Sequence, residues 1–199
     1  MRAIIETQFL APISVFSTLK KCDEVLIDVH ESYQKRSYRN KCFLTGPQGK
    51  ISFSIPLKKG KHEQQLITQV EIAYDENWIR QFKQLCQSNY SRSAFLEHIF
   101  DDICTILDLK HQYLYELNTS LHLWINQFLE LEYSLSETDD YHSTYNAEDL
   151  TDYRHHWLPK HQLNNKFYPQ VFEDKNGFVA GLSILDLLFC CGKEAELYL

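Results

Sequence analysis

The chain lacks the short motifs by which common nucleotide, metal and nucleophile sites are recognised. It has no Walker A loop, no G-x-G-x-x-G turn, no G-x-S-x-G elbow and no H-E-x-x-H helix. An acyl or aminoacyl donor, if one is used, is therefore expected to bind without a familiar nucleotide motif, and the cofactor stays unknown. Patterns of helix-turn-helix, RNA-recognition and zinc-finger proteins are also missing, so we expect no nucleic-acid partner.

Long apolar runs are missing as well. No stretch approaches the roughly 18 uncharged apolar residues that a membrane helix needs. The first residues, 1–16, include Glu6 and lack the basic-then-apolar order of a secretory signal. The cysteines form no C-x-x-C pair and lie mostly among apolar neighbours, which is typical of buried thiols in a reducing compartment. They are Cys22, Cys42, Cys86, Cys104, Cys190 and Cys191. We expect a soluble cytoplasmic protein with no membrane span.

Composition favours a globular chain with an uneven charge. The 199 residues are 44% hydrophobic, which suits one domain over 1–199 with a buried core. Residues 1–70 hold 11 Lys and Arg against 6 Asp and Glu, whereas residues 71–199 hold 9 against 21. A basic N-terminal third favours an anionic small molecule, such as a phosphate or a sugar nucleotide, over duplex nucleic acid.

The N-terminal half has the pattern of an α/β protein. Residues 3–5 predict a first strand, 12–19 a helix and 24–29 a second strand, and this β-α-β order favours a parallel pair. The turn Gly46-Pro-Gln-Gly49 stands between 41–44 and an alternating run at 51–57, which predicts a hairpin in a mixed sheet. Alternation also predicts a strand over 68–74.

The C-terminal half is predicted to be mainly helical. Apolar side chains recur at helical spacing over 77–87, 95–107 and 114–128. Residues 134–166 are polar, and we expect a mobile surface loop there, which could act as a lid over a ligand. The S-x-x-D spacing of Ser183 and Asp186 before an apolar run predicts a capping box at a helix start.

The densest polar cluster follows the second strand. The carboxyl end of a strand in an α/β sheet is where ligand crevices form. Cations there could hold a phosphate or carboxylate, and tyrosines could stack on a sugar or a base. A solvated, charged loop is the alternative explanation of the same residues. The cluster comprises His30, Glu31, Tyr33, Gln34, Lys35, Arg36, Tyr38, Arg39 and Asn40.

Two parts of the chain resemble the WbqC-like family. The stretch E-S-Y-Q-K-R-S-Y-R-N-K-C at 31–42, read with 5–14, resembles the family's N-terminal segment Y-Q-K-x-S-Y/W-R-N-R. The stretch Tyr168-Pro-Gln170-Val-Phe, followed by G-F and L-S-I-L-D-L-L-F at 177–189, resembles its C-terminal ending. Trp78 and Tyr90 stand where the family places a Trp and a Tyr.

The resemblance implies a role in bacterial surface-polysaccharide (O-antigen) biosynthesis. Transfer of a glycine, aminoacyl or acyl group to a sugar precursor is the activity it suggests. In that case Lys35, Arg36 and Arg39 would hold the anionic group, and His30 or Glu31 would be the general base. The other hypothesis is a non-catalytic binding or scaffold protein for an anionic sugar or nucleotide. A base of perturbed pKa beside the cluster would favour the enzyme.

Tyr168 and Gln170 are expected to reach the same site from the other motif. They stand before a predicted strand, and a hydroxyl and an amide from there would form the second wall of a cleft with residues 30–40. We expect Arg36 and Arg39 to be surface cations whose removal hardly affects folding.

Other candidates have simpler explanations. His155 and His156 are adjacent, and adjacent side chains seldom reach one ion, so no metal site is predicted. A cap explains Ser183 without a nucleophilic role, and packing explains Cys190 and Cys191.

Overall fold

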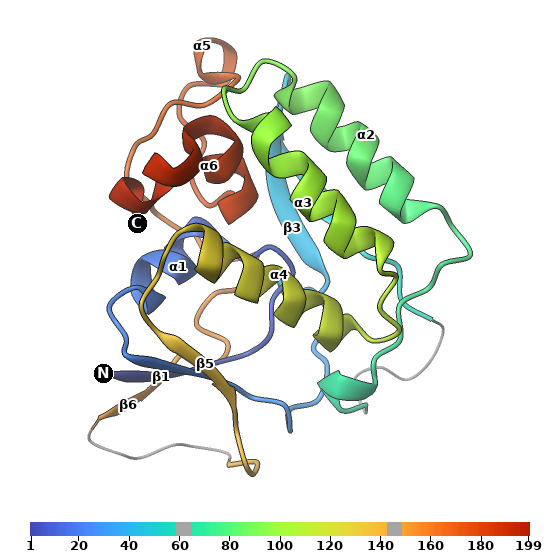
Figure 1. The fold of residues 1–199 in the computed structure, drawn as a ribbon, viewed down its shortest axis with the longest axis vertical. Helices are drawn as coiled ribbons and strands as arrows, with labels where there is room; N and C mark the ends of the chain where they lie inside the picture. Colours follow the sequence, from blue (N-terminus) through green and yellow to red (C-terminus); the bar gives the residue numbers. More distant parts are fainter. Residues whose placement is uncertain (59–64, 143–148) are drawn as a thin grey trace.

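A four-stranded parallel sheet forms one end of the molecule (Figure 1). The computed structural model describes residues 1–58, 65–142 and 149–199. The strand order is β5-β2-β1-β6, and every neighbouring pair is parallel. The strands are β1 (Arg2–Ile5), β2 (Glu24–Ile27), β5 (Ser134–Glu137) and β6 (Leu150–Asp152).

The predicted β-α-β opening is confirmed. Helix α1 (Ile13–Leu19) connects β1 to β2, and Ile4 pairs with Leu26 in the register between them. The side chains of Ala3, Val25 and other apolar residues of β1 and β2 are buried, because these two central strands form part of the hydrophobic core. Since all four strands are parallel, their carboxyl ends meet at one edge of the sheet.

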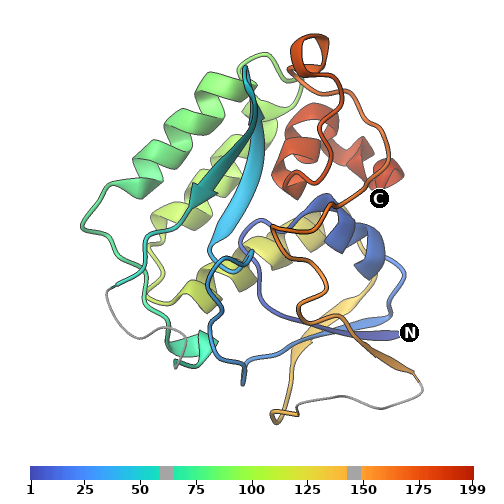
Figure 2. The same ribbon diagram turned by 180° about the vertical axis from the view of Figure 1, so that it is seen from behind.

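The predicted hairpin forms its own two-stranded sheet. Strands β3 (Lys41–Gly46) and β4 (Gly49–Ser54) are antiparallel, and Pro47 and Gln48 make the turn between them. Figure 2 shows this hairpin lying in front of the helices α2 (Trp78–Tyr90) and α3 (Leu96–Asp108). The ring of Phe53 packs against Phe82, with centroids 4.8 Å apart. The α/β class with parallel and antiparallel parts is therefore confirmed.

The three long helices lie where helical spacing predicts them. Each is amphipathic and buries one apolar face in the common core. They are α2 (Trp78–Tyr90), α3 (Leu96–Asp108) and α4 (Leu114–Phe128). Helix α4 also bonds to the loop after β2, because the Asn118 side chain donates to the carbonyl oxygen of Arg39 at 2.8 Å.

The C-terminal segment closes the core. It contains α5 (Glu173–Asn176), α6 (Ile184–Cys191) and the 3₁₀ turn η3 (Gly192–Tyr198). Ser183 caps α6 as predicted: its Oγ accepts from the amide of Leu185 at 3.2 Å and donates to the carbonyl of Leu10 at 2.7 Å. Gly192 ends α6 at a φ of 58°, a left-handed conformation that favours glycine.

The role predicted for Asp186 is wrong. It is fully buried and does not close a capping box, since the backbone amide of Ser183 donates to Phe43 instead. The two oxygens of Asp186 accept from the hydroxyl groups of Tyr90 and Tyr168. A buried carboxylate requires such donors, and these bonds tie α2 and the C-terminal segment to α6.

Two other expectations need correction. Residues 68–74 form no regular strand: they contain part of the 3₁₀ turn η2 (Ile67–Gln69) and isolated bridges at Glu71 and Ile72. Within 134–166, the expected loop, lie β5 and β6, which flank the central strands of the sheet. Both strands are short and polar and lie at the edges of the sheet. They therefore show no apolar alternation that would predict a strand. Residues 143–148 lie outside the described part.

The state of the cysteines and the apolarity of the helices can be compared with the sequence predictions. All six cysteines are free thiols, four of them buried, as the sequence predicts. None of the helices in the described ranges combines the length and apolarity that a bilayer crossing requires.

Candidate functional site

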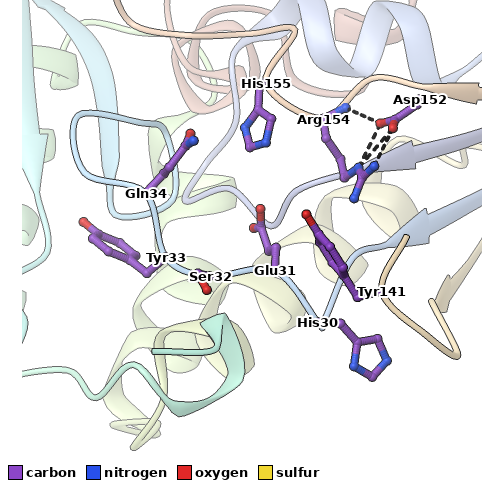
Figure 3. Close-up of a pocket in the computed structure, with 9 residues that line it drawn as sticks. All are labelled: His30, Glu31, Ser32, Tyr33, Gln34, Tyr141, Asp152, Arg154 and His155. Carbon is purple, nitrogen blue, oxygen red and sulfur yellow. Dashed lines mark hydrogen bonds and ion pairs between the residues drawn. The ribbon is translucent and has the colours of Figure 1, made fainter. Parts of the chain in front are cut away.

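A pocket opens at the carboxyl edge of the parallel sheet (Figure 3). Its volume is about 980 Å³. Residues that follow β2, β5 and β6 contribute side chains to it, so segments distant in sequence meet at one place. The lining residues are His30, Glu31, Ser32, Tyr33, Gln34, Tyr141, Asp152, Arg154 and His155.

Arg154 joins the ends of two strands. Its Nη1 donates to Asp28, just after β2, at 2.7 Å, and its Nη2 donates to Asp152, the last residue of β6, at 2.6 Å. Strand β1 lies between these two strands, so the guanidinium bridges across it. The guanidinium also lies 5.9 Å from the ring centroid of Tyr141. These interactions make one wall of the pocket rigid.

A second ion pair lies at the base of the pocket. Nε and Nη2 of Arg39 donate to the two carboxylate oxygens of Glu31, with Nε at 2.9 Å from Oε1. The Arg39 side chain is 0% exposed. Burial raises the pKa of Glu31 to about 7, while the ion pair with Arg39 acts in the opposite direction.

His155 faces Glu31 across the pocket. In Figure 3 its imidazole and the Glu31 carboxylate point toward each other. Its backbone N–H donates to Glu6, just after β1, at 2.8 Å. Burial lowers the pKa of His155; Arg39 and Arg154 lower it further, and Glu6 opposes them. The imidazole is therefore neutral at neutral pH and can accept a proton.

His30, the histidine expected to be the base, is engaged elsewhere. Its Nε2 lies 3.0 Å from the carbonyl oxygen of Thr138. A carbonyl only accepts hydrogen bonds, so this contact requires the proton on Nε2. In Figure 3 the ring points away from Glu31 and His155. His30 thus lines the pocket but binds the segment after β5.

The tyrosines and the asparagine of the predicted cluster hold the loop itself. The Tyr33 hydroxyl donates to Asn40 at 3.0 Å, and the Asn40 amide donates to the carbonyl of Ile55 at 2.9 Å. Tyr38 is 2% exposed and packs edge-on against Phe43, so its ring is closed to a ligand. Tyr33 and the exposed Gln34 line the pocket.

The three cations of the cluster do not line the pocket. Arg39 is buried against Glu31, which corrects the expectation of a surface cation. Lys35 and Arg36 are exposed and follow the lining residue Gln34 directly. A sequence window cannot show which cation folds back onto the acid eight residues before it.

Tyr168 and Gln170 do not reach this pocket. Tyr168 is buried and donates to Asp186 at 2.6 Å. The side chain of Gln170 makes two hydrogen bonds with the backbone of Val179, each 2.8 Å long. Both residues therefore stabilise the C-terminal segment, and the second wall of the pocket comes from 152–155 instead.

Sequence reasoning missed the wall formed by β6 and the residues after it. Asp152, Arg154 and His155 have no recognisable spacing, and their strand pattern is only three residues long. The available signal was the run Asp152-Tyr-Arg-His155, which is polar and charged like the cluster after β2. Across the residues that the structure describes, no group of three or more His, Cys, Asp or Glu is placed to hold a metal ion.

Comparison with known proteins identifies the family. The profile of the WbqC-like protein family matches residues 7–157. This range includes the pocket residues from His30 to His155, whereas the motif at 168–189 lies beyond it. The chain belongs to the WbqC-like protein family, as its sequence motifs indicate.

A mycobacterial relative matches over nearly the full length of both chains. The "Uncharacterized protein Rv1507c" of Mycobacterium tuberculosis (strain ATCC 25618 / H37Rv) is 25% identical over an alignment of length 224, which covers 99% of this chain and 96% of the relative. No solved structure matches the chain.

Proposed function

We propose that this protein is a transferase that places an acyl or aminoacyl group on a sugar precursor of bacterial surface polysaccharide. The pocket at the carboxyl edge of the sheet is the site of transfer. The observation that carries the proposal is the pair formed by His155 and Glu31. Their side chains face each other across the pocket, and burial shifts their pKa values in opposite directions. Such pairs are typical of acid–base sites.

In this proposal His155 is the general base. The imidazole takes the proton from a hydroxyl or amino group of the sugar as that group attacks the carbonyl carbon of an activated ester or thioester. A new ester or amide bond forms, and the bond from the carbonyl carbon to the leaving group breaks. The leaving group departs with the electron pair of that bond and receives the proton from His155.

Glu31 orients the acceptor group. Arg39 holds its carboxylate in one geometry, and each oxygen of the carboxylate retains capacity to accept a further hydrogen bond. Glu31 thus binds the acceptor group next to the reacting atoms. His155, and not His30, is the base in this proposal, because Nε2 of His30 is bound to Thr138.

An anionic part of the substrate would lie outside the pocket. Lys35 and Arg36 are exposed and adjoin Gln34 on the pocket wall, so they suit the phosphates of a sugar nucleotide. The exposed ring of Tyr141 offers an apolar face for a sugar at the mouth of the pocket.

The test is a transfer assay read by mass spectrometry. Purified protein is incubated with a panel of nucleotide sugars and simple acyl and aminoacyl thioesters, and the sugar product is weighed. The proposal expects an acylated sugar, with a rate reduced about 10²–10⁴-fold by His155→Gln. The matched control is His156→Gln, since His156 is adjacent but does not line the pocket. Equal rates for both variants would refute the role of His155.

A binding protein for the same class of ligand is the second candidate. It is favoured by the ion pairing of Glu31, Asp28 and Asp152, whose carboxylates are all held by guanidinium groups of this chain. This candidate predicts saturable binding of a sugar nucleotide in calorimetry without product formation from any donor in the panel.

A further inference from the structure

Glu6 is a buried carboxylate with no cationic partner in the described parts of the chain. It stands directly after β1, one of the two central strands, and is 1% exposed. Its oxygens accept from the Gln8 side-chain amide at 2.9 Å and from the His155 backbone amide at 2.8 Å. Both donors are neutral.

The carboxylates around Glu6 are paired differently. Glu31 is paired with Arg39, and Asp28 and Asp152 are both paired with Arg154. An isolated buried carboxylate is unfavourable unless a positive charge compensates it. Among the residues that the structure describes, Glu6 therefore stands out as a buried carboxyl group that is held only by neutral donors.

The group placed to supply that charge is the imidazole of His155. Burial lowers the pKa of this histidine, and the negative charge of Glu6 acts in the opposite direction, against burial and against the guanidinium groups of Arg39 and Arg154. Asp152 acts in the same direction as Glu6, but its carboxylate is already bound to Arg154. Glu31 faces the ring across the pocket and is bound to Arg39.

Glu6 also fixes the backbone of His155. The φ of His155 is 62°, in the left-handed region that residues other than glycine seldom adopt. Such a conformation persists only where the surroundings hold it, and it is found often at functional sites. The hydrogen bond from the His155 amide to Glu6 holds this conformation, which directs the ring into the pocket.

We propose that Glu6 is a positioning residue for His155: its carboxylate holds the His155 backbone and stabilises the imidazolium that forms when the ring takes a proton. This inference rests on the proposed function, in which His155 is the base. Glu6 itself touches neither the reacting atoms nor the pocket surface. Its charge acts through His155.

The test is an NMR titration of the histidine rings in the whole protein, with His155 assigned from the loss of its signals in His155→Gln. Glu6→Gln keeps the size and one hydrogen-bond acceptor but removes the charge. The proposal expects the pKa of His155 to fall by about half a unit or more in this variant. The matched control, Glu24→Gln, removes a carboxylate at the opposite end of β2 and should leave the pKa of His155 unchanged.

A second measurement covers the case in which Glu6→Gln does not fold. In the wild-type protein the ¹³C signal of the Glu6 carboxyl group should shift at the pH where His155 titrates, and this step should be absent in His155→Gln. An unchanged pKa of His155 in Glu6→Gln, or a Glu6 signal insensitive to His155, overturns the inference.

Activity separates this inference from the proposed function. If the pKa of His155 falls in Glu6→Gln but no donor and sugar react with the wild type, the coupling of the two residues holds and the transferase proposal fails. If the wild type is active, the acidic limb of its pH–rate profile should move to lower pH in Glu6→Gln. A profile that does not move contradicts the role of Glu6.

Discussion

Arg39 donates two hydrogen bonds to Glu31, and both side chains are almost completely shielded from water. The pair fixes the loop after β2 against the base of the pocket, since the backbone carbonyl of Arg39 also accepts from Asn118 of α4. The same two residues thus serve the fold and the candidate site.

Replacing Arg39 should strongly destabilise the protein. Arg39→Ala leaves Glu31 buried without its partner, and breaking a buried ion pair in this way costs about 3–5 kcal/mol. Denaturant unfolding gives the value. The matched control is Arg36→Ala. Because the Arg36 side chain is exposed, this substitution should change the free energy of unfolding by less than about 0.5 kcal/mol. Equal midpoints for the two variants would show that the buried pair contributes nothing to stability.

Loss of the Tyr168 hydroxyl should lower the free energy of unfolding most at neutral pH. Burial raises the pKa of Asp186 to about 6, and the hydrogen bond from Tyr168 acts to lower it. That bond favours the ionised carboxylate, so its contribution is present above the folded pKa and declines as pH falls through it. Tyr168→Phe should cost about 1.5–3 kcal/mol at neutral pH and about 0.5–1.5 kcal/mol near pH 4.

Unfolding free energies measured across this pH range test the sign. Tyr141→Phe serves as the control, because its ring is exposed and the loss of its hydroxyl should give no pH-dependent change. A cost of Tyr168→Phe that grew toward acidic pH would mean that the Tyr168 hydroxyl favours the protonated form of Asp186, which contradicts this prediction.

Removing the cap of α6 should weaken the C-terminal helix. Ser183→Ala deletes the acceptor for the Leu185 amide and the donor to Leu10, and the expected cost is about 0.5–2 kcal/mol. Ser52→Ala, at an exposed position in β4, is the comparison. An unchanged melting midpoint together with lost transfer would indicate a catalytic serine rather than a cap.

Apolar periodicity was sufficient to predict the core elements. The central strands bury Ile4 and Val25, and α3 buries residues at helical spacing, so their patterns follow directly from burial. Strands β5 and β6 are edge strands with burial on few positions, and nothing in S-L-S-E or L-T-D distinguishes a strand from a loop. Their place in the sheet is set by tertiary pairing.

Only the part of the candidate site that follows β2 could be predicted from the sequence, because, of the strands that lead to the pocket, only β2 has a recognisable apolar pattern. Glu31, Tyr33 and Gln34 follow a recognisable strand, so the rule on carboxyl ends locates them. Arg154 and His155 follow a strand that has no apolar alternation, so the sequence favours Tyr168 and Gln170 for that wall instead. The burial of Arg39 depends on its pairing with Glu31, which only the folded chain defines.

The most direct test of the account maps where a ligand binds. Backbone amide NMR spectra of the whole protein are recorded during titration with the panel of nucleotide sugars. We predict shifts concentrated at residues 30–34 and 152–155, and a weaker affinity in His155→Gln than in His156→Gln. Shifts centred on Tyr168 and Gln170, or no shift with any member of the panel, would contradict the assignment of the site to this pocket.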